Sequence, residues 1–239
     1  MSVVRARVRF WLHAPVLPVA VAMGAHARRR MPSLPEAAGE RGGAVAGDGA
    51  AFELAVLGES TAAGVGVGSQ EEGLGFALAR ALRRHVRVQI AGESGATVAR
   101  VHELVSSLAF PVDAVVVAIG VNDTLELTRG RTWTRRVAAL VRDLRARGAR
   151  EVVVSGLPPL GAFRSLPQPT RSAVGARADY LDALLRRTCA ALDARYVALN
   201  LPPREEYLAR DGFHPSAAGY ARWAETIAAT ALTATAKAP

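Results

Sequence analysis

An unbroken run of six apolar residues, Ala-Val-Val-Val-Ala-Ile at 114–119, constrains the fold of this chain most strongly. A strand with one face in water alternates apolar and polar residues, so a continuous run indicates a strand covered on both faces. Other apolar, β-branched runs lie at 52–57, 86–90, 151–155 and 196–199, and segments expected to be helical lie at 74–84, 98–108, 133–147, 173–194 and 217–234. This alternation predicts an α/β fold in which helices lie on both sides of a five-stranded parallel sheet.

The first 50 residues differ in composition from residues 51–239, which we expect to form one domain. Three arginines precede an apolar run at 10–25, and an Ala-His-Ala site with three further arginines follows it, an order that resembles a signal peptide. Prolines at 15 and 18 would interrupt a helix there, and the run is shorter than the ~20 residues that span a bilayer. We therefore favour a segment 1–30 that lies on an anionic membrane surface or packs on the domain, followed by a linker at 39–49. A cytoplasmic or peripherally membrane-associated protein is expected, with secretion as the alternative.

Charge and cysteine content exclude several classes of function. The net charge is +9, but the basic residues are spread along the chain, and arginines such as Arg142, Arg145 and Arg147 are typical of a solvated helix face. We therefore expect no nucleic-acid partner. The single cysteine, Cys189, excludes an intramolecular disulfide and a zinc site built on two or more cysteines.

The loop after the first strand contains a candidate nucleophile, Ser60. Ligands of open parallel sheets bind beyond the carboxyl ends of the strands, so chemistry is expected in such loops. A phosphate-binding P-loop would need a lysine that the segment 58–66 lacks, and its glycines do not have the spacing of a dinucleotide-binding turn. Ala62 stands where an α/β-hydrolase elbow needs glycine. Ser60 on a tight turn after Gly58 is either an exposed nucleophile or a serine that caps the next segment.

A serine hydroxyl needs a base and a group that orients the base. Of the five histidines, His214 alone lies beside a carboxylate, Asp211, in a loop after the last strand. Three-residue spacing on a turn lets Asp211 accept a hydrogen bond from the imidazole, although the same pair would also fit a turn that caps the last helix.

Two further loops contain donors that an ester hydrolase needs for its developing oxyanion. Asn122 follows the buried strand 114–119, so its amide can point into the same crevice as Ser60. Gly92 follows the second strand and exposes a backbone N–H with no Cβ in the way. Each loop alone would fit a simple turn, but the coincidence of four such strand-end loops favours a catalytic site.

Together these loops resemble the SGNH hydrolases, also called the GDSL esterase/lipase family. The four letters correspond to Ser60, Gly92, Asn122 and His214, and the resemblance covers about residues 52–235. It implies a flavodoxin-like, three-layer α/β/α domain with five parallel strands, and hydrolysis of acyl esters without a metal or cofactor. It also implies that Ser60 attacks, that His214 is the base oriented by Asp211, and that the Ser60 N–H, the Gly92 N–H and the Asn122 amide form the oxyanion hole.

Three positions depart from the family pattern. Glu59 stands where the family has aspartate, one methylene shorter, which changes how this side chain braces neighbouring loops. Ile90 and Ala96 replace an asparagine and an aspartate of the second block, so hydrogen bonds made by those groups are lost or replaced.

The substrate pocket is expected around Thr61, beside the nucleophile, and in the apolar loop 156–163. This loop is stiffened by two prolines, and Leu157, Pro158, Leu160 and Phe163 would line an acyl pocket; a plain surface connection is the alternative. We expect a serine ester hydrolase whose partner is a small-molecule or lipid acyl ester. An acyltransferase or carbohydrate-ester deacetylase with the same site, or an inert flavodoxin-like binding domain, are the alternatives.

Overall fold

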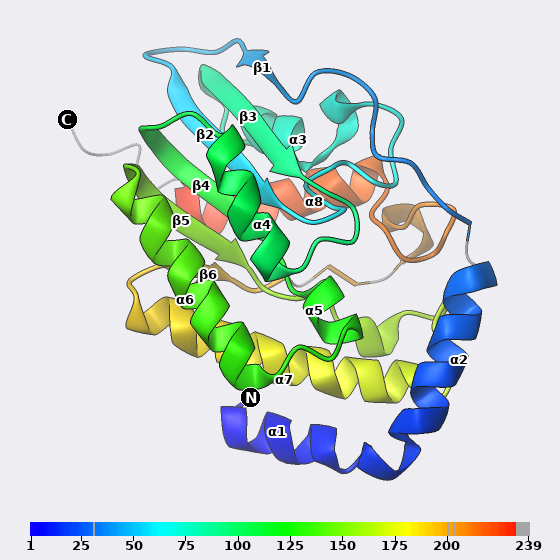
Figure 1. Ribbon diagram of the computed structural model, residues 1–239. Helices are drawn as coiled ribbons and strands as arrows, with labels where there is room; N and C mark the ends of the chain where they lie inside the picture. The colour runs from blue at the N-terminus through cyan, green and yellow to red at the C-terminus, as the bar shows by residue number, and fades with distance from the viewer. Residues whose placement is uncertain (31, 200, 203, 233–239) are drawn as a thin grey trace.

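The computed structural model describes residues 1–30, 32–199, 201–202 and 204–232, which contain a six-stranded sheet with helices on both faces (Figure 1). The sheet order is β1-β3-β2-β4-β5-β6, with β2 to β6 parallel and β1 antiparallel to β3. The five parallel strands have the strand order of flavodoxin-like folds, so the predicted architecture is confirmed. The strands are β1 (Gly42–Val45), β2 (Phe52–Gly58), β3 (Val86–Gly92), β4 (Val112–Ala118), β5 (Ala149–Ser155) and β6 (Arg195–Val197).

Helices α4, α6 and α7 cover one face of the sheet, and α3 and α8 cover the other (Figure 1). Alternate residues of β4 point to the two sides: Val115 and Val117 pack in the first core, Val116 in the second, which is why the strand is apolar throughout. The helices are α1 (Val3–Trp11), α2 (Leu17–Arg30), α3 (Leu74–Ala81), α4 (Val98–Leu104), α5 (Val121–Leu125), α6 (Gly130–Ala146), α7 (Thr170–Ala191) and α8 (Ala217–Ile227).

The predicted helices are all present, with boundaries that move by a few residues. The helix predicted at 98–108 becomes 3-10 after Leu104, and the one predicted at 217–234 continues as a π-helix from Ala228 to Leu232. The last two positions of that prediction lie outside the described residues. Each helix in the part of the chain that the structure describes is either too short or too polar to span a bilayer.

The segment predicted as a linker at 39–49 instead contains strand β1. Its residues Gly42 to Val45 pair with β3 from Gln89 to Val86, and the Ile90 N–H donates to the Arg41 carbonyl at 2.8 Å. An edge strand is stabilised by backbone hydrogen bonds, so a Gly- and Ala-rich segment can form one without an alternating side-chain pattern. This is why composition predicted a linker here.

The N-terminal segment forms two helices that pack on α7: α1 runs alongside it, and α2 crosses its N-terminal end (Figure 1). Arg9 forms an ion pair with Asp179 at 2.7 Å, and the rings of Phe10 and Tyr180 stack with centroids 6.4 Å apart. Thr170 Oγ1 donates to the Ala20 carbonyl at 2.7 Å. Of the arrangements considered for residues 1–30, packing on the domain is the one in this structure.

Candidate active site

The ends of the central strands align at one edge of the sheet. Gly58 of β2 is paired with Gly92 of β3 and with Ala118 of β4, so the loops after these three strands leave the sheet side by side. The order of the parallel strands reverses at β2, the position where open sheets form a ligand crevice. Ser60 and Asn122 follow β2 and β4 at this edge.

Ser60, His214 and Asp211 form a hydrogen-bonded chain. The distance from Ser60 Oγ to His214 Nε2 is 3.1 Å, and that from His214 Nδ1 to Asp211 Oδ2 is 2.6 Å. A carboxylate can only accept, so the Nδ1 atom bears the imidazole proton and Nε2 accepts from the serine hydroxyl. The sequence prediction named these three residues, and the structure brings them together from loops more than 150 residues apart.

Asp211 is buried but held in its ionised form. Burial raises the pKa of a carboxyl group, yet the hydrogen bonds from the His214 ring and from the backbone N–H groups of Phe213 and His214 bring the pKa of Asp211 below its ordinary value. The Asp-Gly-Phe-His turn therefore fixes the acceptor that orients the imidazole. Phe213 packs edge-on against the His214 ring, with centroids 5.4 Å apart.

The Ser60 loop is held against the His214 loop by a glycine. Gly66 has φ +111°, and a Cβ there would lie 2.3 Å from the Pro215 carbonyl oxygen. One residue earlier, the Val65 carbonyl accepts from the buried Tyr220 hydroxyl of α8 at 2.7 Å. The nucleophile and the base thus come from two loops that touch through their backbones.

Glu59 is buried beside the nucleophile and braces the loop after β4. Its carboxylate accepts from the Val121 N–H at 2.8 Å, from the Asn122 N–H at 2.9 Å and from Asn122 Nδ2. Burial raises the pKa of Glu59 to about 7, the hydrogen bonds from Asn122 and Val121 oppose this shift, and the charge of Asp123 adds to it. At this position, where the family that the sequence resembles has aspartate, the longer glutamate makes these contacts.

Asn122 lies at the cleft beside Ser60, but both hydrogens of its amide already have acceptors. Nδ2 donates to Glu59 Oε2 and, at 3.2 Å, to the Ala96 carbonyl. The position of Asn122 agrees with the sequence prediction. One Nδ2 hydrogen must leave its bond to the Ala96 carbonyl before it can donate to a ligand.

Gly92 has a different place from the one predicted. It ends β3 tightly against the Ser60 loop, where a Cβ would lie 2.5 Å from the Ala63 nitrogen, and it lines neither cavity next to Ser60. Gly95, with φ +83° and open space around it, lines the cleft instead. Among the described residues no acceptor is present for the backbone N–H of Ser60 or of Gly95. The Ser-Gly dipeptide at 94–95 indicates a turn in the sequence, but it does not tell which of the two glycines faces the cleft.

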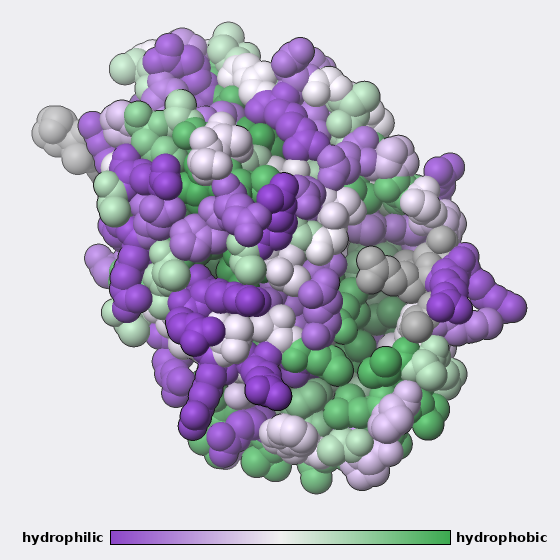
Figure 2. Space-filling model, in the orientation of Figure 1, coloured by the Kyte–Doolittle hydropathy of each residue, from purple (hydrophilic) through white to green (hydrophobic). Residues whose placement is uncertain are grey.

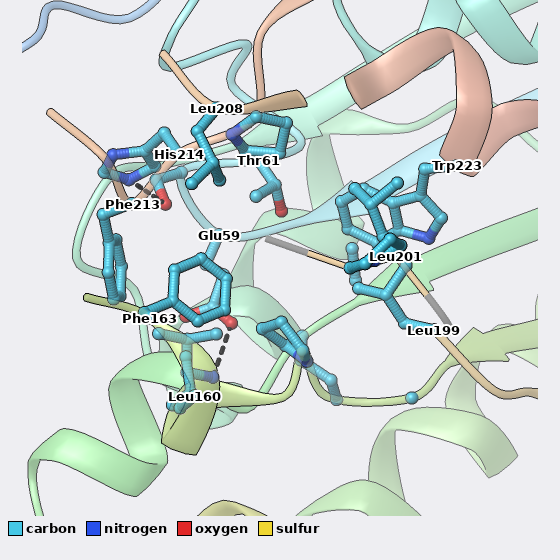
Figure 3. Close-up of a pocket in the computed structure, with 18 residues that line it drawn as sticks. Glu59, Thr61, Leu160, Phe163, Leu199, Leu201, Leu208, Phe213, His214 and Trp223 are labelled. Atoms are coloured by element: carbon cyan, nitrogen blue, oxygen red, sulfur yellow. Dashed lines mark hydrogen bonds between the residues drawn. The ribbon is translucent and has the colours of Figure 1, made fainter. Parts of the chain in front are cut away.

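A narrow apolar cavity of about 50 Å³ extends from Ser60. In Figure 3, His214 and Phe213 lie at one end, and Trp223, Leu199 and Leu201 lie at the other. Trp223 is fixed there because its Nε1 donates to Ser155 Oγ at 3.0 Å. The side chains at the far end come from the segment after β6 and from α8, two pocket elements that were not predicted from the sequence.

Four of the five predicted pocket residues line this cavity: Thr61, Pro158, Leu160 and Phe163. The prediction for Leu157 is wrong. Its side chain packs in the core, where Cδ1 would lie 2.9 Å from a Cβ at Gly120, while its N–H donates to Asp182 at 3.0 Å. Successive residues of an extended loop point to opposite sides, so the neighbours of Pro158 cannot all face the cavity.

A second, larger cleft of about 440 Å³ opens on the other side of Ser60. One wall is the loop and helix that follow β4, with Asn122, Thr124 and Leu127; α7 supplies another wall. The third wall is N-terminal: Leu17, Ala20, Val21 and Gly24 of α2, with Ser33 and Leu34 beyond it. A contribution of the N-terminal segment to the site was not predicted from the sequence.

Known proteins share this sequence pattern. Residues 56–222 match the model of the GDSL-like lipase/acylhydrolase family. Over 188 residues the chain is 34% identical to the GDSL-like esterase Rv1075c of Mycobacterium tuberculosis, a match that covers 73% of this chain and 60% of the length of that relative.

Solved structures share the fold. A lipolytic protein of the G-D-S-L family from Desulfitobacterium hafniense superposes with a TM-score of 0.62 at 14% identity, covering 74% of this chain and 98% of that one. An extracellular lipase from Streptomyces rimosus gives a TM-score of 0.56 at 19% identity, covering 75% and 99%. The likeness at these identities is one of fold, whereas the family model matches most of the domain in sequence. The chain therefore belongs to the GDSL-like lipase/acylhydrolase family.

Proposed function

We propose that this protein hydrolyses carboxylic esters through Ser60, His214 and Asp211. The observation that carries the proposal is the chain of hydrogen bonds from Ser60 Oγ through His214 to Asp211, at the point where an apolar cavity meets an open cleft. Family membership and the curated esterase relative support the same reaction class.

The reaction follows from the proton positions. Ser60 Oγ attacks the ester carbonyl while His214 Nε2 takes its proton, and the imidazolium is stabilised by Asp211. Collapse of the tetrahedral intermediate releases the alcohol, which receives the proton from Nε2, and leaves an acyl group on Ser60. Water then attacks the acyl-enzyme with His214 as base, which releases the acid and restores the serine.

The developing oxyanion needs preorganised donors. The backbone N–H groups of Ser60 and Gly95 are unengaged among the described residues. Asn122 adds a third donor when one Nδ2 hydrogen turns from the Ala96 carbonyl, the longer of its two bonds. We therefore assign Gly95, rather than Gly92, to the oxyanion hole.

The two cavities suggest how an ester lies across Ser60. The cavity between Phe163, Leu199 and Trp223 is narrow and apolar and suits a short acyl chain, whereas the wide cleft suits a larger alcohol part. The expected substrate is therefore an ester of a short fatty acid with a bulky alcohol or lipid backbone.

The test compares the full chain with its Ser60→Ala variant on p-nitrophenyl esters of increasing acyl length, with mass spectrometry after fluorophosphonate treatment. We expect an adduct on Ser60, turnover that depends on Ser60, and a fall in kcat/KM beyond short acyl chains. Ser106→Ala, an exposed serine away from both cavities, is the matched control and should keep the adduct and the turnover.

Other outcomes would redirect the proposal. A folded protein with neither adduct nor turnover would favour an inert binding domain. A product that shifts from acid to a new ester when an acceptor alcohol or sugar is added would indicate acyl transfer by the same acyl-enzyme. Turnover restricted to acetyl esters of sugars would indicate a carbohydrate-ester deacetylase.

A further inference from the structure

Helix α1 has two apolar faces, and only one of them packs on the protein. Ala6 and Phe10 are buried against α7. On the opposite side, Val4, Val8 and Trp11 recur at the i, i+4, i+7 spacing of a helical stripe and are 65%, 54% and 60% exposed. A helix that needed only to pack on this domain would have polar residues on that side.

The exposed stripe belongs to a larger apolar surface. Among the described residues, every large hydrophobic side chain that is exposed lies in the first 21 residues or at Leu127. Figure 2 shows hydrophobic side chains gathering over α1, α2 and α5, at the lower right of the view. Val21 and Leu127 are part of this surface and also line the cleft beside Ser60. The exposed apolar surface therefore runs up to the mouth of the cleft.

The N-terminal segment, which forms most of this surface, has charged side chains of one sign only. Residues 1–35 contain six arginines and no aspartate or glutamate. Arg5 and Arg7 are exposed on α1 at the two borders of the apolar stripe, and Arg29 and Arg30 are exposed at the end of α2. An apolar stripe between arginines is the pattern of helices that lie in the interface of anionic bilayers.

Contacts of α1 and α2 with α7 determine which side of α1 faces outward. Arg9 pairs with Asp179, the Arg177 guanidinium lies 5.1 Å from the Phe10 ring centroid, and Thr170 binds the Ala20 carbonyl. The stripe cannot turn inward without losing these contacts. A second copy of the chain is a poor partner for it, because the arginines of both copies would then face one another.

We propose that the outer face of α1, α2 and the segment between them, formed by Val4, Val8, Trp11, Leu12, Val16 and Val19 with its bordering arginines, docks on an anionic lipid surface. Docking brings the mouth of the cleft, at Val21 and Leu127, to the bilayer. If the proposed function holds, the substrate is then an acyl ester resident in or at that bilayer. Binding itself does not depend on the reaction.

The experiment measures binding of the full chain carrying Ser60→Ala to sedimented vesicles, which keeps the lipids intact. Vesicles of phosphatidylcholine are compared with vesicles that also contain phosphatidylglycerol. Val8→Asp with Trp11→Asp introduces two charges into the stripe. Ala218→Asp with Ala221→Asp makes the same charge change at exposed sites of α8, on the opposite face of the sheet. Thermal melting by circular dichroism checks that every variant is folded.

We expect binding to the phosphatidylglycerol vesicles, its loss in the α1 variant, and its retention in the α8 variant. Absence of binding by the parent, or equal binding by the two variants, would overturn the proposal. So would a dimer in light scattering that the α1 variant alone dissociates, because a second copy would then cover the stripe. Hydrolysis of a soluble ester by the chain with Ser60 intact is measured separately, so failure of docking and failure of the proposed reaction are distinguishable.

Discussion

Asp211 offers the sharpest test at the scale of a single residue. Asn at this position keeps the shape of the side chain, but its amide can present a hydrogen to Nδ1 and stabilise the tautomer in which Nε2 bears the proton. That imidazole cannot accept from Ser60, so we expect Asp211→Asn to lower kcat about 10⁴-fold. Steady-state hydrolysis of a p-nitrophenyl ester measures this, and a loss smaller than about tenfold would show that another carboxylate orients His214.

Asn122 tests the donors of the oxyanion hole. Its amide is engaged by Glu59 and Ala96 in the free protein, so any catalytic contribution must come from a hydrogen that moves toward the intermediate. We expect Asn122→Ala to lower kcat about 10²–10³-fold, or ~2.7–4 kcal/mol in the barrier, with a far smaller change in KM. A rate equal to that of the parent would remove Asn122 from the reaction and leave the two backbone donors.

The raised pKa of Glu59 predicts that the free energy of unfolding depends on pH. The pKa of Glu59 is raised from 4.5 to about 7 in the folded protein, so between these values the native state holds a proton that the unfolded chain has lost. Stability therefore decreases as the pH rises from about 4.5 through about 7. Glu59→Gln has no such proton, and we expect the free energy of unfolding of the parent to fall relative to this variant across the range. Urea unfolding of the parent and of Glu59→Gln at several pH values measures this difference. If the two free energies of unfolding changed in parallel with pH, the raised pKa of Glu59 would be contradicted.

At the scale of elements, the contact between the Ser60 loop and the His214 loop depends on Gly66. A Cβ there meets the Pro215 backbone at 2.3 Å, and the loops must separate to accommodate it. We expect Gly66→Ala to slow fluorophosphonate labelling of Ser60 and to lower the melting temperature. Gly49→Ala is the matched control, since Gly49 also has a positive φ, of +82°, but has no atom near its Cβ position. Equal effects of the two changes would mean that backbone strain, and not the contact, is responsible.

The sequence predicted the elements well where burial imposes a pattern. The apolar runs of β2, β4 and β5 and the helices between them follow from burial on both faces of the sheet. The prediction from the sequence failed where backbone contacts determine the structure. An example is β1, whose glycines pair with β3 without any side-chain signal. The same limit explains Gly92 and Gly95: both glycines suit an exposed N–H, and only the path of the loop decides which one faces the cleft.

At the scale of the whole molecule, the candidate site is assembled from both ends of the chain. Ser60, His214 and Asp211 were predictable because their chemical roles demand one another and strand ends converge. The wall supplied by Ala20 and Val21 was not, because it depends on how α2 docks on α7, a contact between segments about 150 residues apart that has no local signature.

Positive charge is unevenly distributed along this chain. The chain has a net charge of +9, and the first 35 residues contain six arginines and no acidic side chain, so positive charge is concentrated in the helices α1 and α2 that form the apolar face. If this local field drives docking, Arg5→Gln with Arg7→Gln should weaken vesicle binding far more than Arg80→Gln with Arg222→Gln, which removes the same charge from α3 and α8. Binding should also fall steeply with salt, since the screening length shrinks from about 10 Å at 0.1 M to about 3 Å at 1 M. Vesicle sedimentation with the Ser60→Ala chain measures both effects. If the two pairs of substitutions weakened vesicle binding equally, net charge alone would attract the protein and α1 would have no special part.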